Sequence, residues 1–475
     1  MTSSYEIDFF LRPFLHGGFM EKWLSLINVA SPDTLRKHPT EVKVLGCCLL
    51  NTFTRACSPT EPINFGNMLL LLTGPRRSAK SWLTGLIEDV MRLFNGPHLI
   101  PHGTPEYIGE AIGKLRWGIL TANEAGEIIT NADNKGYMST WGYIINKIYM
   151  LEGIQMGRRK KGKSIMVQGR SYYVSLLMNA LPGDITTMFE HWSGLERRFI
   201  PLSFTRVPRR AWKATQERHA VLNEMISILK SLSRAVVIVD LPEEPLSEVG
   251  SKLDKEDADK PDEIKALNDA KWEYAIRLTL SVFIDRAVTQ ICHLLERGER
   301  RGEGSLHGGC NYVISPVTDS SDRTPYRGDI LEMYPPDITV ELSPPAKETL
   351  QVMVTSVHLL SPLWGQFVTG LMGLFGFDGK IASRVAEMLN MVKSKGCVNL
   401  RDLYRGPLKP LMKLREIGGV KGLWVKIIGP LEAAGQIAVR RYVKGQTLVF
   451  DPNKRYCGTC SKWGTLLQVG HRALP

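Results

Sequence analysis

The chain has 475 residues, of which 43% are hydrophobic, and its formal net charge is +12. This composition excludes a disordered chain and leaves room for roughly two to four domains with ordinary cores. The excess of positive charge favours a polyanionic partner. No apolar stretch approaches the roughly 20 residues that a bilayer span requires, and no signal-peptide layout precedes the first apolar run. We therefore expect a cytoplasmic protein with no membrane partner.

Residues 1–60 show mostly helical spacing, with apolar stretches at 19–29 and 42–53, and we interpret them as a helical N-terminal cap. Strand and helix patterns then alternate over 61–206. This alternation predicts an α/β core with a parallel sheet covered on both faces. Five strands are expected, near residues 69–73, 98–100, 115–120, 172–178 and 199–204.

The first of these strands leads into a loop of the phosphate-binding kind. The pattern is Gly, four residues, Gly, Lys, then Ser or Thr; Gly74, Lys80 and Ser81 are in register, and Ala79 replaces the second glycine. Backbone N–H groups and the following helix N-terminus would bind phosphates. Lys80 would meet the β and γ phosphates of ATP, and Ser81 would reach Mg²⁺. The predicted loop comprises Gly74, Pro75, Arg76, Arg77, Ser78, Ala79, Lys80 and Ser81. The alternative is a chance strand-turn-helix.

The strand at 115–120 ends in an acidic residue, Glu124, which we predict to be the base that activates water. Many enzymes of this kind have an aspartate just before it that helps to hold the metal. Here that position is Asn123, whose neutral amide would weaken Mg²⁺ binding. The structural alternative for Glu124 is an exposed carboxylate at a strand end.

Two further strands carry polar groups at their ends. Asn179 follows the strand at 172–178 and would align the attacking water and sense the γ-phosphate, although an asparagine before Pro182 and Gly183 is also an ordinary turn former. Arg197 and Arg198 precede the last strand and would reach a neighbouring subunit's γ-phosphate. Their structural alternative is a solvated pair or a salt bridge.

The order of these motifs resembles that of AAA+-type ATPases, most closely the branch with minichromosome-maintenance helicases, superfamily 3 viral helicases and the helicase-like halves of phage and plasmid replication proteins. The resemblance covers roughly residues 60–206. It implies that Lys80 belongs to Walker A with Gly74 and Ser81, that Glu124 is the Walker B base, that Asn179 is sensor 1 and that Arg198 is an arginine finger. The departures at Ala79 and Asn123 leave open a protein that binds ATP and hydrolyses it slowly.

A basic segment lies between the strand at 115–120 and the strand at 172–178. We predict two short strands within 153–168 around a positively charged tip made of Arg158, Arg159, Lys160, Lys161 and Lys163. In the related helicases a hairpin at this place projects into the central pore. Such a cluster suits contact with the nucleic-acid backbone without sequence readout. The alternatives are a solvated loop and a targeting signal.

Helical spacing dominates after residue 206. Residues 207–300 are interpreted as a helical lid, with helices at 212–236 and 263–300 separated by an acidic surface excursion at 243–262. Arg277 or Arg286 is a candidate second sensor, although either would more commonly be a surface arginine. Residues 301–375 combine an irregular connection with a helix at 346–375.

Residues 376–452 are predicted to be a winged-helix domain. Helices are expected at 381–393, 398–404 and 423–434, followed by a hairpin that turns at Lys444 and Gly445. Arg440, Arg441 and Lys444 would then contact the DNA backbone from the wing. The alternative is a protein docking module.

Eight cysteines are spread over the chain, which is typical of a reducing compartment with mostly buried thiols. In the tail, 453–475, Cys457 and Cys460 have the spacing of half a zinc knuckle, and no fourth ligand is evident nearby. We expect two thiols, or a knuckle completed by another subunit, rather than a complete zinc site.

The combined prediction is an ATP-dependent DNA helicase or replication-initiation motor of a virus, plasmid or integrated element. It would use ATP and Mg²⁺ and act as a homo-oligomeric ring, a hexamer, on single-stranded or forked DNA. One alternative is a nucleotide-gated DNA-binding regulator with weak or no ATPase activity, favoured by Ala79 and Asn123. A second is a partner-binding protein that retains only the fold.

Overall fold

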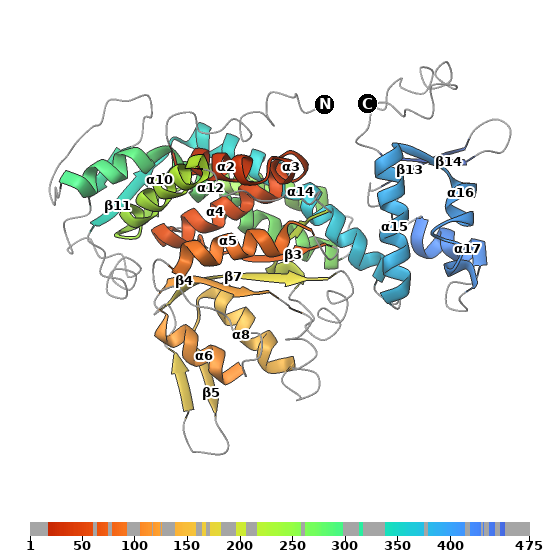
Figure 1. Cartoon of the computed structure of the whole chain (residues 1–475), viewed down its shortest axis with the longest axis horizontal. Coiled ribbons are helices and arrows are strands. Elements are labelled where there is room, and N and C mark those ends of the chain that lie inside the picture. The colour runs from red at the N-terminus through yellow and green to blue at the C-terminus, as the bar shows by residue number, and fades with distance from the viewer. Residues whose placement is uncertain are drawn as a thin grey trace. The chain divides into compact units, whose positions relative to one another are not determined.

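The computed structural model divides into two compact units, Met1–Ser361 and Pro362–Pro475 (Figure 1). The residues that it describes are 18–59, 64–74, 78–92, 105–115, 117–123, 125, 138–157, 164–167, 172–181, 196–205, 216–257, 262–297, 313–316, 338–374, 379–413, 419–428, 431, 437–441 and 447–451. All statements below concern these residues.

The N-terminal segment is helical, as predicted. It forms α2 (Phe19–Ala30), α3 (Pro32–Lys37) and α4 (Pro39–Thr54). Proline opens both α3 and α4, where its missing N–H costs no helical hydrogen bond. From Val42 to Thr54, every residue of α4 is buried, so this helix is part of a buried core.

The sheet that carries the phosphate-binding loop is parallel, with the order β4 (Trp117–Ala122), β7 (Tyr173–Ala180), β3 (Leu69–Thr73) and β8 (Ile200–Ser203). Four of the five predicted strands are therefore present, and the fifth, at 98–100, lies outside the described residues. Figure 1 shows α5 (Lys80–Arg92) on one side of this sheet and α8 (Met138–Met150) on the other. All eight residues of β7 are buried, which agrees with coverage on both faces.

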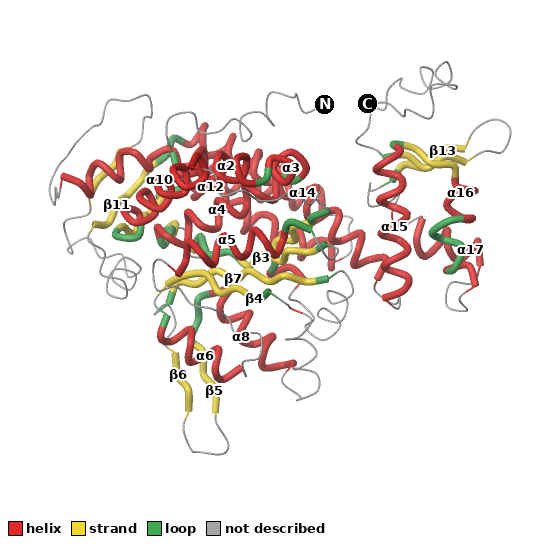
Figure 2. The backbone as a smooth tube through the Cα atoms, viewed as in Figure 1, coloured by secondary structure: helices red, strands yellow, loops and turns green. Residues whose placement is uncertain are grey.

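The predicted basic hairpin has two antiparallel strands, β5 (Ile154–Gly157) and β6 (Ser164–Val167). They pack against α6 (Pro105–Lys114) and extend away from the sheet of β3 (Figure 2). The tip, residues 158–163, is not among the described residues.

The region predicted to be a helical lid contains a strand. Helix α10 spans Gln216–Leu232, and β9 (Ala235–Val239) follows it, so the expected helix at 212–236 is wrong at its C-terminal end. Five consecutive apolar residues form β9, and all are buried. A short apolar run of this kind cannot be distinguished from a helix segment by periodicity alone.

A second sheet, which we did not predict, is built on β9. Its order is β10 (Val313–Pro316), β11 (Ile338–Ser343), β9, β1 (Cys57–Ser58) and β2 (Asn64–Phe65). The strand β9 pairs in parallel with both β11 and β1. The expected helical cap, lid and irregular connection are therefore joined by one sheet.

Three long helices accompany this sheet. The acidic stretch predicted to be a surface excursion is a helix, α11 (Glu243–Asp257). The predicted helices at 263–300 and 346–375 correspond to α12 (Asp262–Arg297) and α14 (Ala346–Leu374). Within α12 the segment Asp269–Glu296 is long and apolar enough to cross a membrane by length and composition, with 72% of its most apolar window buried inside the protein. The prediction that no stretch approaches this length is corrected accordingly.

The C-terminal unit consists of helices and a three-stranded antiparallel sheet. In chain order it has α15 (Gly379–Lys395), β12 (Cys397–Asn399), α16 (Leu400–Arg405), α17 (Gly419–Leu423) continued by a π-helical turn at Trp424–Ile428, then β13 (Ala438–Arg441) and β14 (Thr447–Phe450). The sheet order is β12, β14, β13. The predicted hairpin is present, whereas the second predicted helix begins later, at Leu400, and the third begins earlier, at Gly419.

Candidate nucleotide site

Lys80 lies at the carboxyl end of the β3 sheet and is almost fully buried, with 6% of its surface exposed. Its ammonium group donates hydrogen bonds to the carbonyl oxygens of Gly74, at 2.8 Å, and of Ala180, at 2.7 Å. Gly74 directly follows β3 and Ala180 ends β7. The lysine thus connects the predicted phosphate loop to the end of the neighbouring strand, and its partners are carbonyls that phosphate oxygens would replace.

The loop has two features that fit a phosphate ligand. The backbone of Gly74 has a φ of +151°, and a Cβ there would lie 2.1 Å from the carbonyl oxygen of Phe204. Only glycine fits this position. The hydroxyl oxygen of Ser78 is buried and has no hydrogen-bond partner among the described residues. Buried polar atoms are ordinarily paired, so Ser78 fits a loop shaped for a ligand.

Asn179 and Asn123 meet at the carboxyl end of the same sheet. The Asn179 amide nitrogen donates to Asn123 Oδ1 at 3.1 Å, and the hydroxyl of Thr84, on α5, lies 3.1 Å from Asn179 Oδ1. Asn179 is 3% exposed, and in the sheet it pairs with Leu72, two residues before Gly74. Lys80, Asn179 and Asn123 were predicted from separate segments, and the fold brings all three together.

Several predicted site residues lie outside the described residues. These are Pro75, Arg76 and Arg77 of the loop, Glu124, the hairpin tip with Arg158, Arg159, Lys160, Lys161 and Lys163, Lys444, and the tail cysteines Cys457 and Cys460. Glu124 is flanked by Asn123 and Ala125, which are described. Arg440 and Arg441 belong to β13, where they pair with Leu448 and Thr447 of β14.

A residue that the sequence did not single out completes the polar cluster. Glu88, two turns beyond Lys80 on α5, accepts hydrogen bonds from the Thr121 hydroxyl and the Asn123 amide, both at 2.7 Å. The spacing of Lys80, Thr84 and Glu88 places them along one face of α5. This spacing was available as a signal, but glutamates on amphipathic helices are too common to select one from a single sequence.

Arg198 does not join this cluster within its own chain. It precedes β8, whose first residue, Ile200, pairs with Leu70 near the start of β3. Because β3 spans five residues at about 3.3 Å each, roughly 15 Å separates this end of the sheet from Gly74. Arg198 therefore lies too far from Gly74 to contact a phosphate bound at the loop of its own chain. Its neighbour Arg197 is exposed.

The guanidinium of Arg198 lies over the ring of Tyr149, 4.5 Å from its centroid, and that of Arg277 lies over the same ring at 4.3 Å. Arg277 is 5% exposed and donates to the backbone carbonyl of Asn67, just before β3. It is thus at the opposite end of β3 from Gly74, which fits a structural cation rather than a second sensor in this chain. The other candidate, Arg286, pairs with Glu348 of α14 at 3.1 Å.

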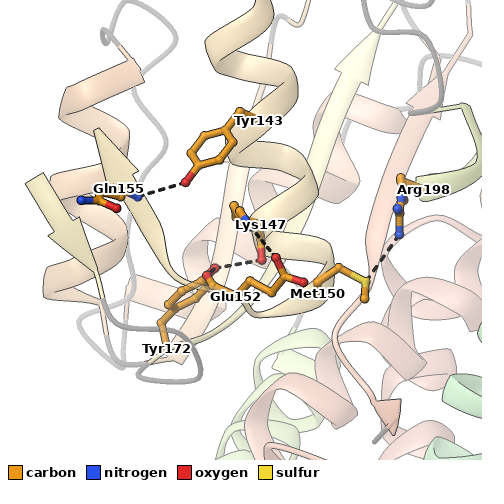
Figure 3. A network of polar contacts seen from close by, with 7 residues as sticks. All are labelled: Tyr143, Lys147, Met150, Glu152, Gln155, Tyr172 and Arg198. Carbon is orange, nitrogen blue, oxygen red and sulfur yellow. Dashed lines mark hydrogen bonds and ion pairs between the residues drawn. The ribbon is translucent and has the colours of Figure 1, made fainter. Parts of the chain in front are cut away.

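The base of the basic hairpin is attached to α8 by the polar network in Figure 3. The backbone N–H of Gln155, in β5, donates to the Tyr143 hydroxyl at 3.1 Å. The hydroxyl of Tyr172 donates to the carbonyls of Lys147, at 2.9 Å, and Glu152, at 2.7 Å. Lys147 and Glu152 also form an ion pair, which raises the pKa of Lys147. One hydrogen bond thus joins β5 to α8, and Tyr172 joins the start of β7 to the end of α8.

Helix α8 also contacts Arg198, which lies just before β8. The Arg198 guanidinium donates to the sulfur of Met150, the last residue of α8, at 3.5 Å (Figure 3). The hairpin base and Arg198 are thus attached to the same helix.

A separate pocket of about 820 Å³ lies at the carboxyl end of β9. Its lining includes the carboxylates of Asp240, Glu243 and Asp254 and the ring of Trp272. Negative charge of this kind disfavours a phosphate ligand. The carboxyl end of β3 therefore suits a phosphate ligand better than this pocket does.

The described cysteines are mostly buried thiols, as predicted. Cys47, Cys48 and Cys57 are free and buried, and burial raises the pKa of each to about 12. Cys292 is free and partly buried, whereas Cys397 is disulfide-bonded. No three His, Cys, Asp or Glu side chains of the described chain gather as a metal site.

The chain matches no protein-family model, and no curated protein matches it in sequence. The assignment of function therefore depends on the geometry above.

Proposed function

We propose that the protein is an ATP-dependent nucleic-acid motor, a DNA helicase or replication-initiation ATPase that works as a homo-oligomeric ring. The observation that carries the proposal is the meeting of Lys80, Asn179 and Asn123 at one edge of a parallel sheet. Asn123 directly precedes Glu124 in the chain. A phosphate loop beside an acidic strand end and an amide is the set of groups that ATP hydrolysis by P-loop enzymes uses.

The proposal gives each residue a role. Bound ATP would supply the phosphoryl group for transfer to water, and Mg²⁺ would neutralise its charge. Lys80 would exchange its two carbonyl partners for phosphate oxygens. Ser81, the exposed second residue of α5, would hold Mg²⁺ together with Asn123. Glu124 would accept the proton of the attacking water, with Asn179 orienting that water.

Arg198 would act on a neighbouring subunit's nucleotide. The support is its position at the edge of the sheet opposite the phosphate loop, where it cannot serve the site of its own chain. A positive charge at the subunit boundary would stabilise charge that develops during phosphoryl transfer. A ring of identical subunits satisfies this requirement at every site.

Two parts of the chain would contact DNA. The hairpin of β5 and β6 carries a basic tip, and its base is attached to α8, which also contacts Arg198. In the C-terminal unit, three helices and a sheet of order β12, β14, β13 support a winged helix, with Arg440 and Arg441 in the wing. Its core is fully buried, with Met388, Leu403 and Val449 each 0% exposed.

ATP turnover with and without single-stranded DNA tests the motor. We expect DNA to stimulate turnover, and Lys80→Ala to abolish nucleotide binding and turnover. Mixing Lys80→Ala subunits with Arg198→Ala subunits should restore part of the activity, because some boundaries then combine an intact lysine with an intact arginine. No recovery in mixtures whose subunits are shown to co-assemble would contradict the role of Arg198 in a neighbouring site.

A second candidate is a nucleotide-gated DNA-binding regulator. It is favoured by the neutral side chain at 123, which is engaged on both sides by Glu88 and Asn179. This candidate predicts ATP binding without stimulated turnover, and sequence-specific DNA affinity that changes with nucleotide. If the unmodified protein shows no nucleotide affinity at all, both candidates fail, and a partner-binding role on a retained fold is left.

A further inference from the structure

The row of polar side chains on α5 contacts the ends of two strands, β7 and β4, in turn. Lys80 contacts the end of β7, and Thr84 contacts Asn179 one residue earlier. Glu88 contacts Thr121 and Asn123 at the end of β4. The first two contacts belong to residues or motifs that the sequence predicts. The contact of Glu88 with Asn123 has no counterpart in that prediction.

Glu88 determines how the two amides are oriented. An ionised carboxylate only accepts hydrogen bonds, so Asn123 must direct its amino group at Glu88, 2.7 Å away. The Asn123 carbonyl then faces Asn179 and accepts from the Asn179 amino group at 3.1 Å. The Asn179 carbonyl is consequently turned toward the Thr84 hydroxyl. One charged group thus orients the whole chain of amides.

The same contact explains why an amide stands at position 123. An aspartate there would place a carboxylate oxygen where the Asn123 nitrogen now lies, 2.7 Å from Glu88 Oε1. Two carboxylates at this separation repel each other and cannot both be ionised without a cation. Glu88 and Asn123 therefore form a matched pair that contains one carboxylate and one amide.

We propose that Glu88 is a positioning residue of the nucleotide site, supplying the negative charge that the end of β4 lacks at Asn123 and turning the Asn179 amino group toward the nucleotide. This inference rests on the proposed function. An amino group has two hydrogens, so Asn179 keeps one for a phosphate oxygen while it donates the other to Asn123. Glu88 then supplies the carboxylate that an aspartate at position 123 would otherwise provide.

The test uses the full chain and four variants: Glu88→Gln, Asn123→Asp, the exchanged pair Glu88→Gln/Asn123→Asp, and the control Asp89→Asn. Asp89 is on the same helix, is exposed and pairs only loosely with Arg92 at 3.3 Å. Binding of a fluorescent ATP analogue is titrated with and without Mg²⁺. The unfolding midpoint of each protein is also measured without nucleotide, so that folding and ligand effects are separated.

Measured without Mg²⁺, each single change should weaken binding about tenfold, because Glu88→Gln loses a hydrogen bond to a charged group and Asn123→Asp brings two carboxylates to 2.7 Å. The exchanged pair should recover to within about threefold of the unmodified protein. In that variant the glutamine amide introduced on α5 can donate to the carboxylate introduced at the end of β4, and this carboxylate still accepts from Asn179. Without nucleotide, Asn123→Asp should lower the unfolding midpoint by about 2 °C, and the exchanged pair should restore it. The control should behave as the unmodified protein.

Two results would overturn the role of Glu88 and leave the proposed function in place. In the first, Glu88→Gln binds the ATP analogue as tightly as the unmodified protein. In the second, the exchanged pair binds it no more tightly than Asn123→Asp. Absence of any nucleotide binding by the unmodified chain would be a different failure. It would overturn the proposed function, and the role of Glu88 with it.

Discussion

Two helices of the first unit each present three polar residues at the same spacing, and they serve different purposes. On α5 these are Lys80, Thr84 and Glu88; on α12 they are Arg277, Ser281 and Asp285. The α5 row contacts strand ends and a loop. The α12 row contacts the backbone of Asn67, the side chain of Asn51 and the backbone of Met20, all buried. Identical spacing therefore accompanies contacts with strand ends and a loop, where we propose a ligand site, on α5, and buried structural contacts on α12.

The difference arises from what the partners can do. The partners of Lys80 are carbonyls at a strand end and a loop, which we propose a phosphate replaces. The partners of the α12 row are groups of other helices and of the chain before β3, which no ligand can reach without unfolding. We expect changes in the α12 row to alter stability alone, and changes in the α5 row to alter ligand binding first.

The largest effect is expected for Arg277→Met. This change leaves the Asn67 carbonyl without its donor and removes a cation that lies over two tyrosine rings. The free energy of unfolding should fall by about 4 kcal/mol, as for other broken buried charge contacts. Urea unfolding at 25 °C measures it. The matched control is Arg286→Gln on the same helix, whose partly exposed ion pair with Glu348 should contribute less than about 1 kcal/mol.

Next is the pH dependence that Asp285 confers. Burial raises the pKa of this carboxyl to about 7, although it accepts a hydrogen bond from the Met20 N–H at 2.8 Å. The folded state holds the proton more tightly than the unfolded chain, so the stabilising contribution is full below about pH 4 and is lost as pH rises through 7. Between pH 5 and pH 8, the free energy of unfolding of Asp285→Asn should therefore rise by about 3 kcal/mol relative to that of the unmodified protein. The free energy of unfolding of both proteins is measured by urea unfolding at each pH. If it changed with pH equally in both, Asp285 would not have a raised pKa.

For Lys80→Ala we expect a smaller change in the free energy of unfolding, about 2 kcal/mol, because the two carbonyls of Gly74 and Ala180 lose their donor. Its effect on ligand binding should be large. The thermal midpoint of the unmodified protein should rise with Mg²⁺ and ATP, whereas that of the variant should not change. Lys147→Ala on α8 is a suitable control, since its exposed ion pair with Glu152 lies away from the site. A variant that ATP still stabilises would remove Lys80 from the nucleotide site.

The smallest expected effects are those of changing Thr84 and Ser281, the middle residues of the two rows. Thr84→Val removes the hydroxyl that faces Asn179, and Ser281→Ala removes one that donates to Asn51 Oδ1 at 2.9 Å. Each should cost about 1 kcal/mol of stability. Only Thr84→Val should also weaken binding of the ATP analogue, by a few-fold. Equal effects of the two variants on binding would break the distinction between the rows.

Much of the candidate site at the carboxyl end of β3 could be predicted from the sequence, because its signals are local. A glycine turn, a lysine and a helix start lie within eight residues of one another, and Asn179 ends a continuous apolar run. The basic hairpin and the hairpin of β13 and β14 were also predicted, since a turn between two short strands is a local pattern. Their strands form over few residues and need no distant partner to be recognised.

The second sheet could not be predicted in the same way. The strand β1 is two residues long, and β9 is an apolar run that reads equally well as a helix end. The strand β9 pairs with β11, about a hundred residues later in the chain, and β1 pairs with β9 as well as with the nearby β2. Non-local pairing of this kind leaves no periodic signal in either segment.

The amino-acid sequence by itself determined where the proposed phosphate loop, an amide-ended strand and the two strands of the β5–β6 hairpin lie, since each is encoded by neighbouring residues. Only the tertiary structure decided that Glu88 belongs with Asn123, that Arg277 is a buried structural cation and that Arg198 lies at the far end of the sheet from Gly74. The physical reason is that charges and amides gain their roles from the groups they face, and those groups come from distant segments.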